Sequence, residues 1–267
     1  MVTSLRDAHV IVTGGSEGIG AAVAEAAIDR GARVSLVARG ADRLEEVARR
    51  LGHDTGWAPA DVADRAALTA AIEHLVSRRG PCDVMVANAG YALPGRFWEL
   101  PDDEFRAEME VNYLGAVHAA AAVLPEMRRR RRGHLCFTSS TAGVIGVYGY
   151  TAYSPTKFAL RGLAESLRAE VAPDGVRVSV VYPPDTDTPG FATENLHKPA
   201  ETAAISGTIQ PIPASKVAEG VVKGIERNRV AIFVDPTTAA LARGSGLAAP
   251  LIRRVLDRQV RQAQRDA

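Results

Sequence analysis

The sequence predicts a doubly wound α/β fold, in which helices cover both faces of a single parallel sheet. Short runs of apolar, β-branched residues alternate with longer helical segments along most of the chain, as in repeated strand–helix–strand units. The runs are apolar at consecutive positions rather than at alternate ones, which is typical of strands buried on both faces. The 267 residues, 46% hydrophobic and 24% charged, suit one globular domain and exclude a disordered or fibrous chain.

The first half of the chain follows this alternation closely. We expect strands at residues 9–13, 33–37, 57–59 and 83–87. We expect helices at residues 18–30, 42–51 and 64–78, the first two of which end before Gly31 and Gly52, because glycine commonly follows the last turn of a helix. Right-handed crossovers then place the strands parallel to one another.

The second half begins with a long helix at 105–127, a strand at 134–138, a long helix at 152–171 and a sixth strand at 177–182. The pattern then breaks, because residues 183–213 are rich in Pro, Thr and Ala without clear periodicity. A loop of this length in a compact domain is usually functional, so we expect a lid. A helix at 217–227 and a last strand at 231–234 complete a single domain over residues 1–267.

Charge and cysteine content limit the possible partners and compartment. The 32 basic and 31 acidic residues give a net charge of +1, so no global field favours nucleic acid. Two cysteines, Cys82 and Cys136, exclude a disulfide framework and fit a reducing compartment. Apolar runs fall well short of the ~20 residues of a membrane helix, and the first residues lack a signal peptide pattern. We therefore expect a cytoplasmic protein with, at most, peripheral membrane contact.

A glycine-rich turn follows the first expected strand and opens the first helix. It has the sequence TGGSEGIG at residues 13–20. Glycines allow a tight turn and a close approach of the backbone to a pyrophosphate, which then lies at the helix N-terminus. The strand–turn–helix context is the confirmation that such a motif needs. The candidate cofactor residues in this turn are Gly14, Ser16, Glu17, Gly18, Ile19 and Gly20.

The end of the second strand favours NADPH/NADP over NAD. An NAD site usually has a carboxylate there, whereas an Arg suits the 2′-phosphate of NADP. This chain has Arg39 at that position and Arg43 four residues later, and both are candidate cofactor residues. Glu17, inside the glycine turn, argues the other way because it could repel the phosphate.

Two further turns lie at the expected carboxyl edge of the sheet, where ligands bind in such folds. Asp61 and Val62 follow the third strand, and Asn88, Ala89 and Gly90 follow the fourth. Each would alone indicate only a turn, but together they fit a nucleotide pocket.

Tyr153 and Lys157 are four residues apart in an expected helix, so their side chains share a face. A nearby ammonium favours the phenolate and is expected to lower the pKa of Tyr153. Such a pair can protonate a carbonyl oxygen as hydride arrives at the carbon. Ser139 and Ser140 end the fifth strand just upstream, and Asn112 lies in the preceding long helix.

With these motifs in this order, the whole chain resembles the short-chain dehydrogenase/reductase family. The matching stretches are TGGSEGIG, Asp61-Val62, NAG at 88–90, Asn112, FTSS at 137–140 and YSPTK at 153–157. The resemblance implies a Rossmann-type fold with Tyr153 as general acid/base and Ser140 polarising the carbonyl. It also implies that Lys157 holds the nicotinamide ribose and that Asn112 holds a water in a proton relay.

A narrower resemblance follows the sixth strand. PPDTDTPGF at 183–191 and KPAET at 198–202 are similar to the 3-ketodihydrosphingosine reductases, which reduce 3-ketosphinganine to sphinganine with NADPH. It implies a lid over a long-chain amino ketone and adds three cofactor residues, Pro183, Thr186 and Thr188. Apolar lid candidates are Phe191, Leu196, Ile205 and Ile209. The alternatives are reduction of another lipid, steroid or acyl ketone, and a noncatalytic NADP-binding sensor.

Several charged groups keep more than one interpretation. Asp185 and Asp187 could meet a substrate ammonium, or cap or bend the lid. The five arginines at 128–132 fit helix-dipole complementarity and solubility. The basic amphipathic tail at 251–267 could lie on a membrane, contact a subunit or pack as a terminal helix, which we favour slightly. The six histidines lack metal-ligand spacing, so we expect no metal site. By the family resemblance, the helices at 105–127 and 152–171 pack between subunits of a homodimer or homotetramer.

Overall fold

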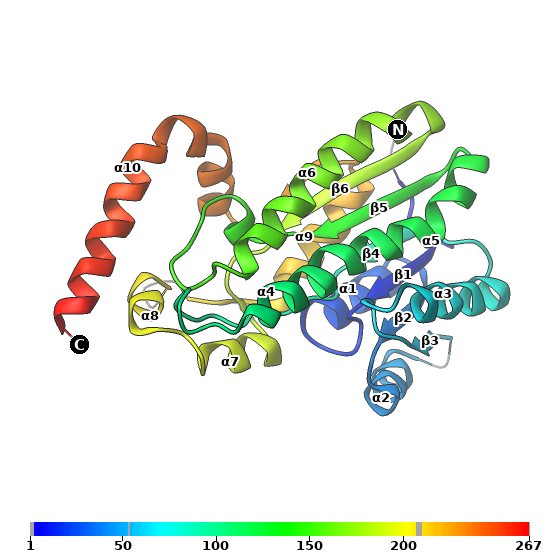
Figure 1. The fold of residues 1–267 in the computed structure, drawn as a ribbon. Coiled ribbons are helices and arrows are strands. Elements are labelled where there is room, and N and C mark those ends of the chain that lie inside the picture. Colours follow the sequence, from blue (N-terminus) through cyan, green and yellow to red (C-terminus); the bar gives the residue numbers. More distant parts are fainter. Residues whose placement is uncertain (1–2, 53, 207–209, 267) are drawn as a thin grey trace.

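The computed structural model describes residues 3–52, 54–206 and 210–266. Its centre is a seven-stranded sheet of order β3-β2-β1-β4-β5-β6-β9, with every neighbouring pair parallel (Figure 1). The doubly wound α/β prediction is therefore confirmed. The strands are β1 His9–Thr13, β2 Arg33–Ala38, β3 Gly56–Pro59, β4 Val84–Ala87, β5 Gly133–Thr138, β6 Val176–Tyr182 and β9 Ala231–Phe233.

Two helical layers bury the two faces of the sheet. Alternate side chains along the strands explain this, since Val12 and Leu36 belong to one core cluster while Ile11 and Met85 belong to the other. The first layer contains α1 Gly18–Ile28, α2 Ala41–Leu51 and α9 Ala214–Glu226. The second contains α3 Arg65–Arg79, α5 Gly115–Arg129 and α6 Tyr153–Val171. Strands apolar at consecutive positions are therefore covered on both faces.

The long helix expected at 105–127 is interrupted, which corrects that prediction. The structure has α4 Asp102–Glu108, a π-helical turn at Met109–Leu114 and then α5. A hydrophobic period of about 3.6 residues does not reveal a π turn, which is a local change in hydrogen-bonding pattern found often at functional sites. Gly115 follows the π turn and packs tightly against Val62, since a Cβ at position 115 would lie 2.6 Å from Val62 Cγ2.

The expected lid contains regular elements that its sequence did not reveal. They are β7 Thr186–Asp187, α7 Pro189–Asn195, α8 Ala200–Ser206 and β8 Ile212–Pro213. Strands β7 and β8 pair in parallel as a separate two-stranded sheet. Elements of two to seven residues are too short to show a periodicity. Ile209 lies outside the described residues.

The chain ends in one long helix, α10 Pro236–Asp266, whose last turns stand beside α8 and away from the main sheet (Figure 1). Gln264 Nε2 donates to Glu201 Oε1 of α8 at 3.3 Å, a contact that fits terminal packing. The side chains of Leu251, Ile252 and Leu256 lie outside the described residues, so the membrane interpretation of the tail stays a prediction. In the described part of the chain, no helix is long and apolar enough to cross a bilayer.

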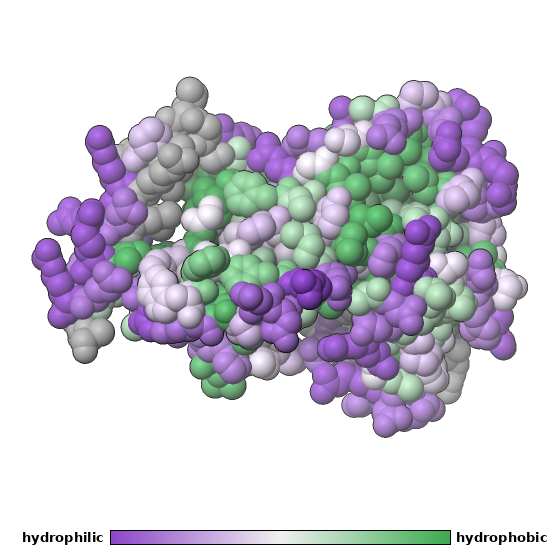
Figure 2. All heavy atoms as spheres, viewed as in Figure 1, coloured by the Kyte–Doolittle hydropathy of each residue, from purple (hydrophilic) through white to green (hydrophobic). Residues whose placement is uncertain are grey.

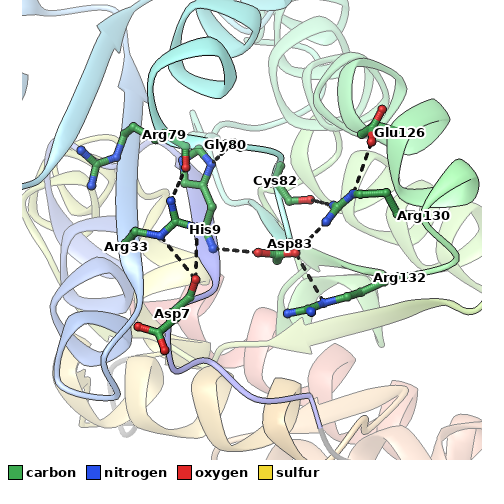
Figure 3. A network of polar contacts seen from close by, with 10 residues as sticks. All are labelled: Asp7, His9, Arg33, Arg79, Gly80, Cys82, Asp83, Glu126, Arg130 and Arg132. Carbon is green, nitrogen blue, oxygen red and sulfur yellow. Dashed lines mark hydrogen bonds and ion pairs between the residues drawn. The ribbon is translucent and has the colours of Figure 1, made fainter.

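Asp83 joins three strands at the amino-terminal edge of the sheet (Figure 3). Its Oδ2 accepts from the His9 N–H of β1 at 3.0 Å, and its Oδ1 accepts from Arg130 Nη1 at 2.9 Å. Its own carbonyl accepts from the His134 N–H of β5 at 2.9 Å, and Arg132 lies 3.5 Å from the carboxylate. The run at 128–132 therefore has structural partners beyond the helix dipole.

This network predicts a measurable loss of stability in Asp83→Ala. The change removes an ionised acceptor and leaves the His9 N–H and Arg130 without a shared partner. We expect the free energy of unfolding to fall by about 2–3 kcal/mol, measured by urea denaturation. The matched control is Asp174→Ala, which removes the more exposed ion pair with Arg128 and should cost less than about 1 kcal/mol. Equal losses in both variants would contradict the role given to Asp83.

Candidate active site

The glycine turn after β1 takes a conformation that its sequence requires. Gly14 and Gly18 have φ values of +68° and +53°, which favour glycine. A Cβ at Gly20 would lie 2.1 Å from the Gly14 carbonyl oxygen, so no other residue fits there without a shift. Ser16, Glu17 and Ile19 are partly exposed in the same turn. The backbone thus forms an open cradle at the start of α1, as a pyrophosphate site needs.

The turn after β4 lies directly against this cradle. The N–H groups of Asn88 and Ala89 both donate to Thr13 Oγ1, at 3.1 and 3.2 Å. A Cβ at Gly14 would lie 2.8 Å from Ala89 Cα. The glycine turn and the Asn88-Ala89-Gly90 turn are therefore packed together at the carboxyl edge of the sheet.

The turn after β3 is held by its own aspartate and by the next layer of helices. Asp61 Oδ1 accepts from the Ala63 N–H at 2.9 Å. Val62 is buried against Gly115, and its carbonyl lies 3.0 Å from His118 Nδ1. Asp61 stays partly exposed at the same carboxyl edge.

Charges at the β2 end of this edge are compatible with a phosphate. Glu17 forms an ion pair with Arg43, so its carboxylate is already balanced within the chain. Arg39 is exposed just beyond β2, and no hydrogen bond or ion pair holds its side chain among the described residues. This pairing answers the objection that Glu17 raised and leaves one unbalanced guanidinium for an anion.

Tyr153, Lys157 and Ser140 meet where β5 and α6 approach each other. Lys157 is buried, its Nζ donates to the Thr138 carbonyl at 3.1 Å, and it lies 5.3 Å from the centroid of the Tyr153 ring. Ser140 Oγ accepts from the Ala142 N–H at 3.1 Å, and the Ser140 hydroxyl acts on the pKa of the Tyr153 side chain. Ser139 Oγ instead donates to the Lys157 carbonyl at 2.9 Å. Ser139 therefore fastens α6 to β5, while Ser140 is the serine beside the tyrosine.

Asn112 is brought to the same place by the π turn. Its side-chain amide pairs with the backbone of Tyr91, accepting from N–H and donating to the carbonyl at 2.9 Å each, and also donates to Thr156 Oγ1 at 3.3 Å. A Cβ at Gly90 would lie 2.7 Å from Asn112 Oδ1 and 3.3 Å from Lys157 Nζ. Only glycine at position 90 allows this approach. The water-holding role of Asn112 stays a prediction.

Burial shifts the pKa values of both Tyr153 and Lys157. Burial raises the pKa of Tyr153, the carboxylates of Glu194, Glu108 and Asp185 raise it further, and Ser140 lowers it. Burial also lowers the pKa of Lys157 to about 8, with Glu108 opposing that shift. Desolvation and the three carboxylates thus raise the pKa of Tyr153 overall, and the lowering expected from the Lys157 ammonium stays a prediction.

The sequence did not indicate two acidic residues that lie near Tyr153. Glu108 is fully buried, its Oε1 accepts from the Leu93 N–H at 2.8 Å, and burial raises its pKa to about 8. Its position four residues before Asn112 places both on one helix face, which is a signal that could have indicated it. Glu194 belongs to α7 and accepts from Tyr150 Oη at 2.5 Å. Because α7 is part of the lid, the position of Glu194 depends on how the lid folds.

The start of the lid connects the end of β6 to the turn after β5 and to the glycine turn. The Pro183 carbonyl accepts from the Thr141 N–H at 3.0 Å, one residue after Ser140. Thr186 is buried and its Oγ1 donates to the Pro184 carbonyl at 2.7 Å. Thr188 caps α7 by accepting from the Phe191 N–H at 3.1 Å, and a Cβ at Gly18 would lie 3.1 Å from its methyl carbon. The lid thus begins in contact with the glycine turn.

Comparison with known proteins agrees with this geometry. The profile of the family described as short chain dehydrogenase matches residues 8–199. The 3-dehydrosphinganine reductase of Danio rerio is 47% identical over 227 residues, which are 82% of this chain and 68% of that protein. The 3-ketodihydrosphingosine reductase of Dictyostelium discoideum is 38% identical over 259 residues, 89% of this chain and 78% of that protein.

A solved structure with lower sequence identity also matches the fold of this chain. The alcohol dehydrogenase of the archaeon Thermococcus sibiricus, complexed with 5-hydroxy-NADP, superposes with a TM-score of 0.73 at 28% identity. The match covers 85% of this chain and 95% of that one. The chain therefore belongs to the short chain dehydrogenase family and is an oxidoreductase.

Proposed function

We propose that this protein reduces 3-ketosphinganine to sphinganine with NADPH. The observation that carries the proposal is the buried Lys157, which lies 5.3 Å from the Tyr153 ring and donates to the Thr138 carbonyl, with Ser140 acting on the pKa of Tyr153 and a lid that starts at the glycine turn. The substrate comes from the relatives, because the reductases of Danio rerio and Dictyostelium discoideum are named for this ketone. The lid sequence at 183–202 supports the same choice.

The residues around the glycine turn fit a nicotinamide dinucleotide phosphate, which supplies a hydride when bound. Gly14, Gly18 and Gly20 would hold the pyrophosphate, and Arg39 the 2′-phosphate, with Arg43 occupied by Glu17. Thr138 Oγ1 and Ser154 Oγ are buried hydroxyls without a hydrogen-bond partner in the described chain. Such orphaned polar atoms fit a site completed by a polar group from outside the chain.

The chain's own part in the reduction is to position the ketone and supply a proton. Ser140 would donate a hydrogen bond to the carbonyl oxygen, and the Tyr153 hydroxyl would transfer its proton to that oxygen. The raised pKa of Tyr153 keeps the phenol protonated at neutral pH, which is the form that reduction requires. Lys157, held by the Thr138 carbonyl 5.3 Å from the ring, would stabilise the phenolate left behind.

We infer that the protein is cytoplasmic and forms a homodimer or homotetramer, and peripheral membrane contact remains a proposal for α10. Apolar side chains gather over α5 and α6 in Figure 2. Phe158 of α6 and Leu114, the residue before α5, are exposed large hydrophobics. Apolar patches on a soluble domain mark association surfaces, which supports subunit packing through these helices.

Tyr153→Phe tests the proton donor. The change keeps the ring and removes the hydroxyl, so kcat should fall by roughly 10²–10⁴-fold while NADPH binding, followed by fluorescence, persists. The matched control is Tyr182→Phe, since Tyr182 is a buried tyrosine of β6 stacked on Phe233, and it should keep near-normal turnover. A normal kcat in the Tyr153→Phe variant would end the assignment of Tyr153.

Arg39→Ala tests the choice of cofactor. It should weaken NADPH by roughly ten- to hundredfold, the effect of one charged hydrogen bond, and leave NADH binding nearly unchanged, because only NADPH has the 2′-phosphate. Arg49→Ala, on the neighbouring helix and paired with Glu45, serves as the control and should change neither affinity. Equal losses for both cofactors in Arg39→Ala would show that Arg39 acts structurally.

A series of 3-keto amines of increasing alkyl length tests the function itself. Each buried methylene contributes about 0.8 kcal/mol, so kcat/KM for NADPH oxidation should rise with chain length until solubility or the pocket limits it. Phe191, Leu196 and Ile205 are the lid's described apolar candidates, although Leu196 is largely exposed. A flat series, or faster reduction of compact ring ketones, would favour a reductase of another ketone class.

A further inference from the structure

The first residues of the lid contain two aspartates in different environments. Asp187 is exposed, whereas Asp185 is half-buried between β6 and β7. The Asp185 carbonyl accepts from the Ile212 N–H at 3.0 Å, which fixes its backbone. Asp185 follows Pro183 by two residues, and the Pro183 carbonyl binds the residue after Ser140. Asp185 therefore lies just beyond the end of β6, close in the fold to Ser140.

Among the described residues, no hydrogen bond and no ion pair reaches the carboxylate oxygens of Asp185. Lys198 acts on its pKa only as a charge at longer range. The charge of Asp185 in turn acts on the pKa values of both Tyr150 and Tyr153, and the rings of these tyrosines are 5.7 Å apart. The half-buried Asp185 carboxylate thus has no hydrogen-bond or ion-pair partner in the described chain, acts electrostatically on the proton donor and can accept from a bound ligand.

Glu194 differs from Asp185 because its charge is already balanced by contact. Lys198 Nζ lies 3.1 Å from Glu194 Oε1 and 4.2 Å from the centroid of the Phe191 ring, and its side chain is only 4% exposed. Tyr150 Oη donates to the same carboxylate at 2.5 Å. This part of the lid thus already encloses one ammonium between a carboxylate and an aromatic face, while Asp185 nearby has no such contact in the described chain.

A second carboxyl group near the proton donor also has an oxygen without a partner. Glu108 is 0% exposed, and its Oε2 is a buried oxygen without a hydrogen-bond donor in the described chain. Its charge acts on Tyr153, as those of Asp185 and Glu194 do. Two carboxyl groups near the proton donor, those of Asp185 and Glu108, thus have oxygens without a hydrogen-bond partner in the described chain, and a bound cationic group would supply one.

We propose that Asp185 selects ketones that carry a protonated amine on the carbon next to the carbonyl, by accepting a hydrogen bond from that ammonium. The inference rests on the proposed function, and it distinguishes Asp185 from Asp187, for which the sequence left the same role open. With the carbonyl oxygen at Ser140 and Tyr153, the nitrogen of an amine on the neighbouring carbon is two bonds from the carbonyl carbon. Asp185 is thus a specificity-determining residue, and the bound ammonium would also offset the negative charge around Tyr153.

The test compares two ketones that differ only in the amine. NADPH oxidation is measured with 3-ketosphinganine and with 1-hydroxyoctadecan-3-one, the desamino ketone of the same chain length. The wild-type enzyme should prefer the amino ketone at least tenfold in kcat/KM. Asp185→Asn should lose roughly ten- to hundredfold on the amino ketone, the effect of one charge-assisted hydrogen bond, mainly through KM, and keep its rate on the desamino ketone. Asp187→Asn, the same change two residues away, should keep both rates.

The outcomes separate this inference from the function on which it rests. If the wild-type enzyme reduces both long-chain ketones equally well, or if Asp185→Asn keeps the preference, Asp185 has no selective role although the reductase function stands. If the wild-type enzyme reduces neither and accepts compact ketones, both proposals fail. Should Asp185→Asn lose turnover of the desamino ketone as well, Asp185→Glu decides, because it keeps the carboxylate and should retain the preference for the amine.

Discussion

Because the chain crosses to the other side of β1 after β3, the helices that follow β1 and β4 cover opposite faces of the sheet. A crevice opens between the two strand ends at such a reversal. Thr13 links the ends of β1 and β4, since its hydroxyl accepts from the N–H groups of Asn88 and Ala89. The glycine turn on one side and the Tyr153–Lys157 helix on the other are both placed by this junction, and the remaining site residues are arranged around it.

Close backbone approach then decides which side chains meet there. Gly90 leaves room for Asn112 Oδ1 and Lys157 Nζ, and Gly115 allows the π turn to pack against Val62. Burial in this junction lowers the pKa of Lys157 and raises that of Tyr153. The same packing that brings the residues together therefore favours the neutral phenol, the form that donates a proton. The geometry and the electrostatics of the site have one origin, which is desolvation at the carboxyl edge.

The sequence was sufficient for features that depend on local pattern. Strands such as β1 and β4 are apolar at consecutive positions, and the glycine turn has a strand–turn–helix context, so both could be predicted. The π turn around Asn112, the elements of the lid and the pKa of Tyr153 could not. The first depends on a contact between Gly115 and Val62, which are distant in sequence. The pKa depends on Glu108 and Glu194, which only the folded chain places near the tyrosine.

The lid connects the two halves of the site through one short helix. Helix α7 starts at Thr188, which lies against Gly18 of the glycine turn, and ends next to Glu194, which binds Tyr150 beside the proton donor. The seven residues of this helix therefore join the glycine turn to Glu194 and its ion-pair partner Lys198. Asp185 precedes this helix and is fixed by β8 through Ile212. The carboxylate that lacks an ion-pair partner among the described residues thus lies before the helix, where the pairing of β7 with β8 holds the backbone, while the paired carboxylate belongs to the helix itself.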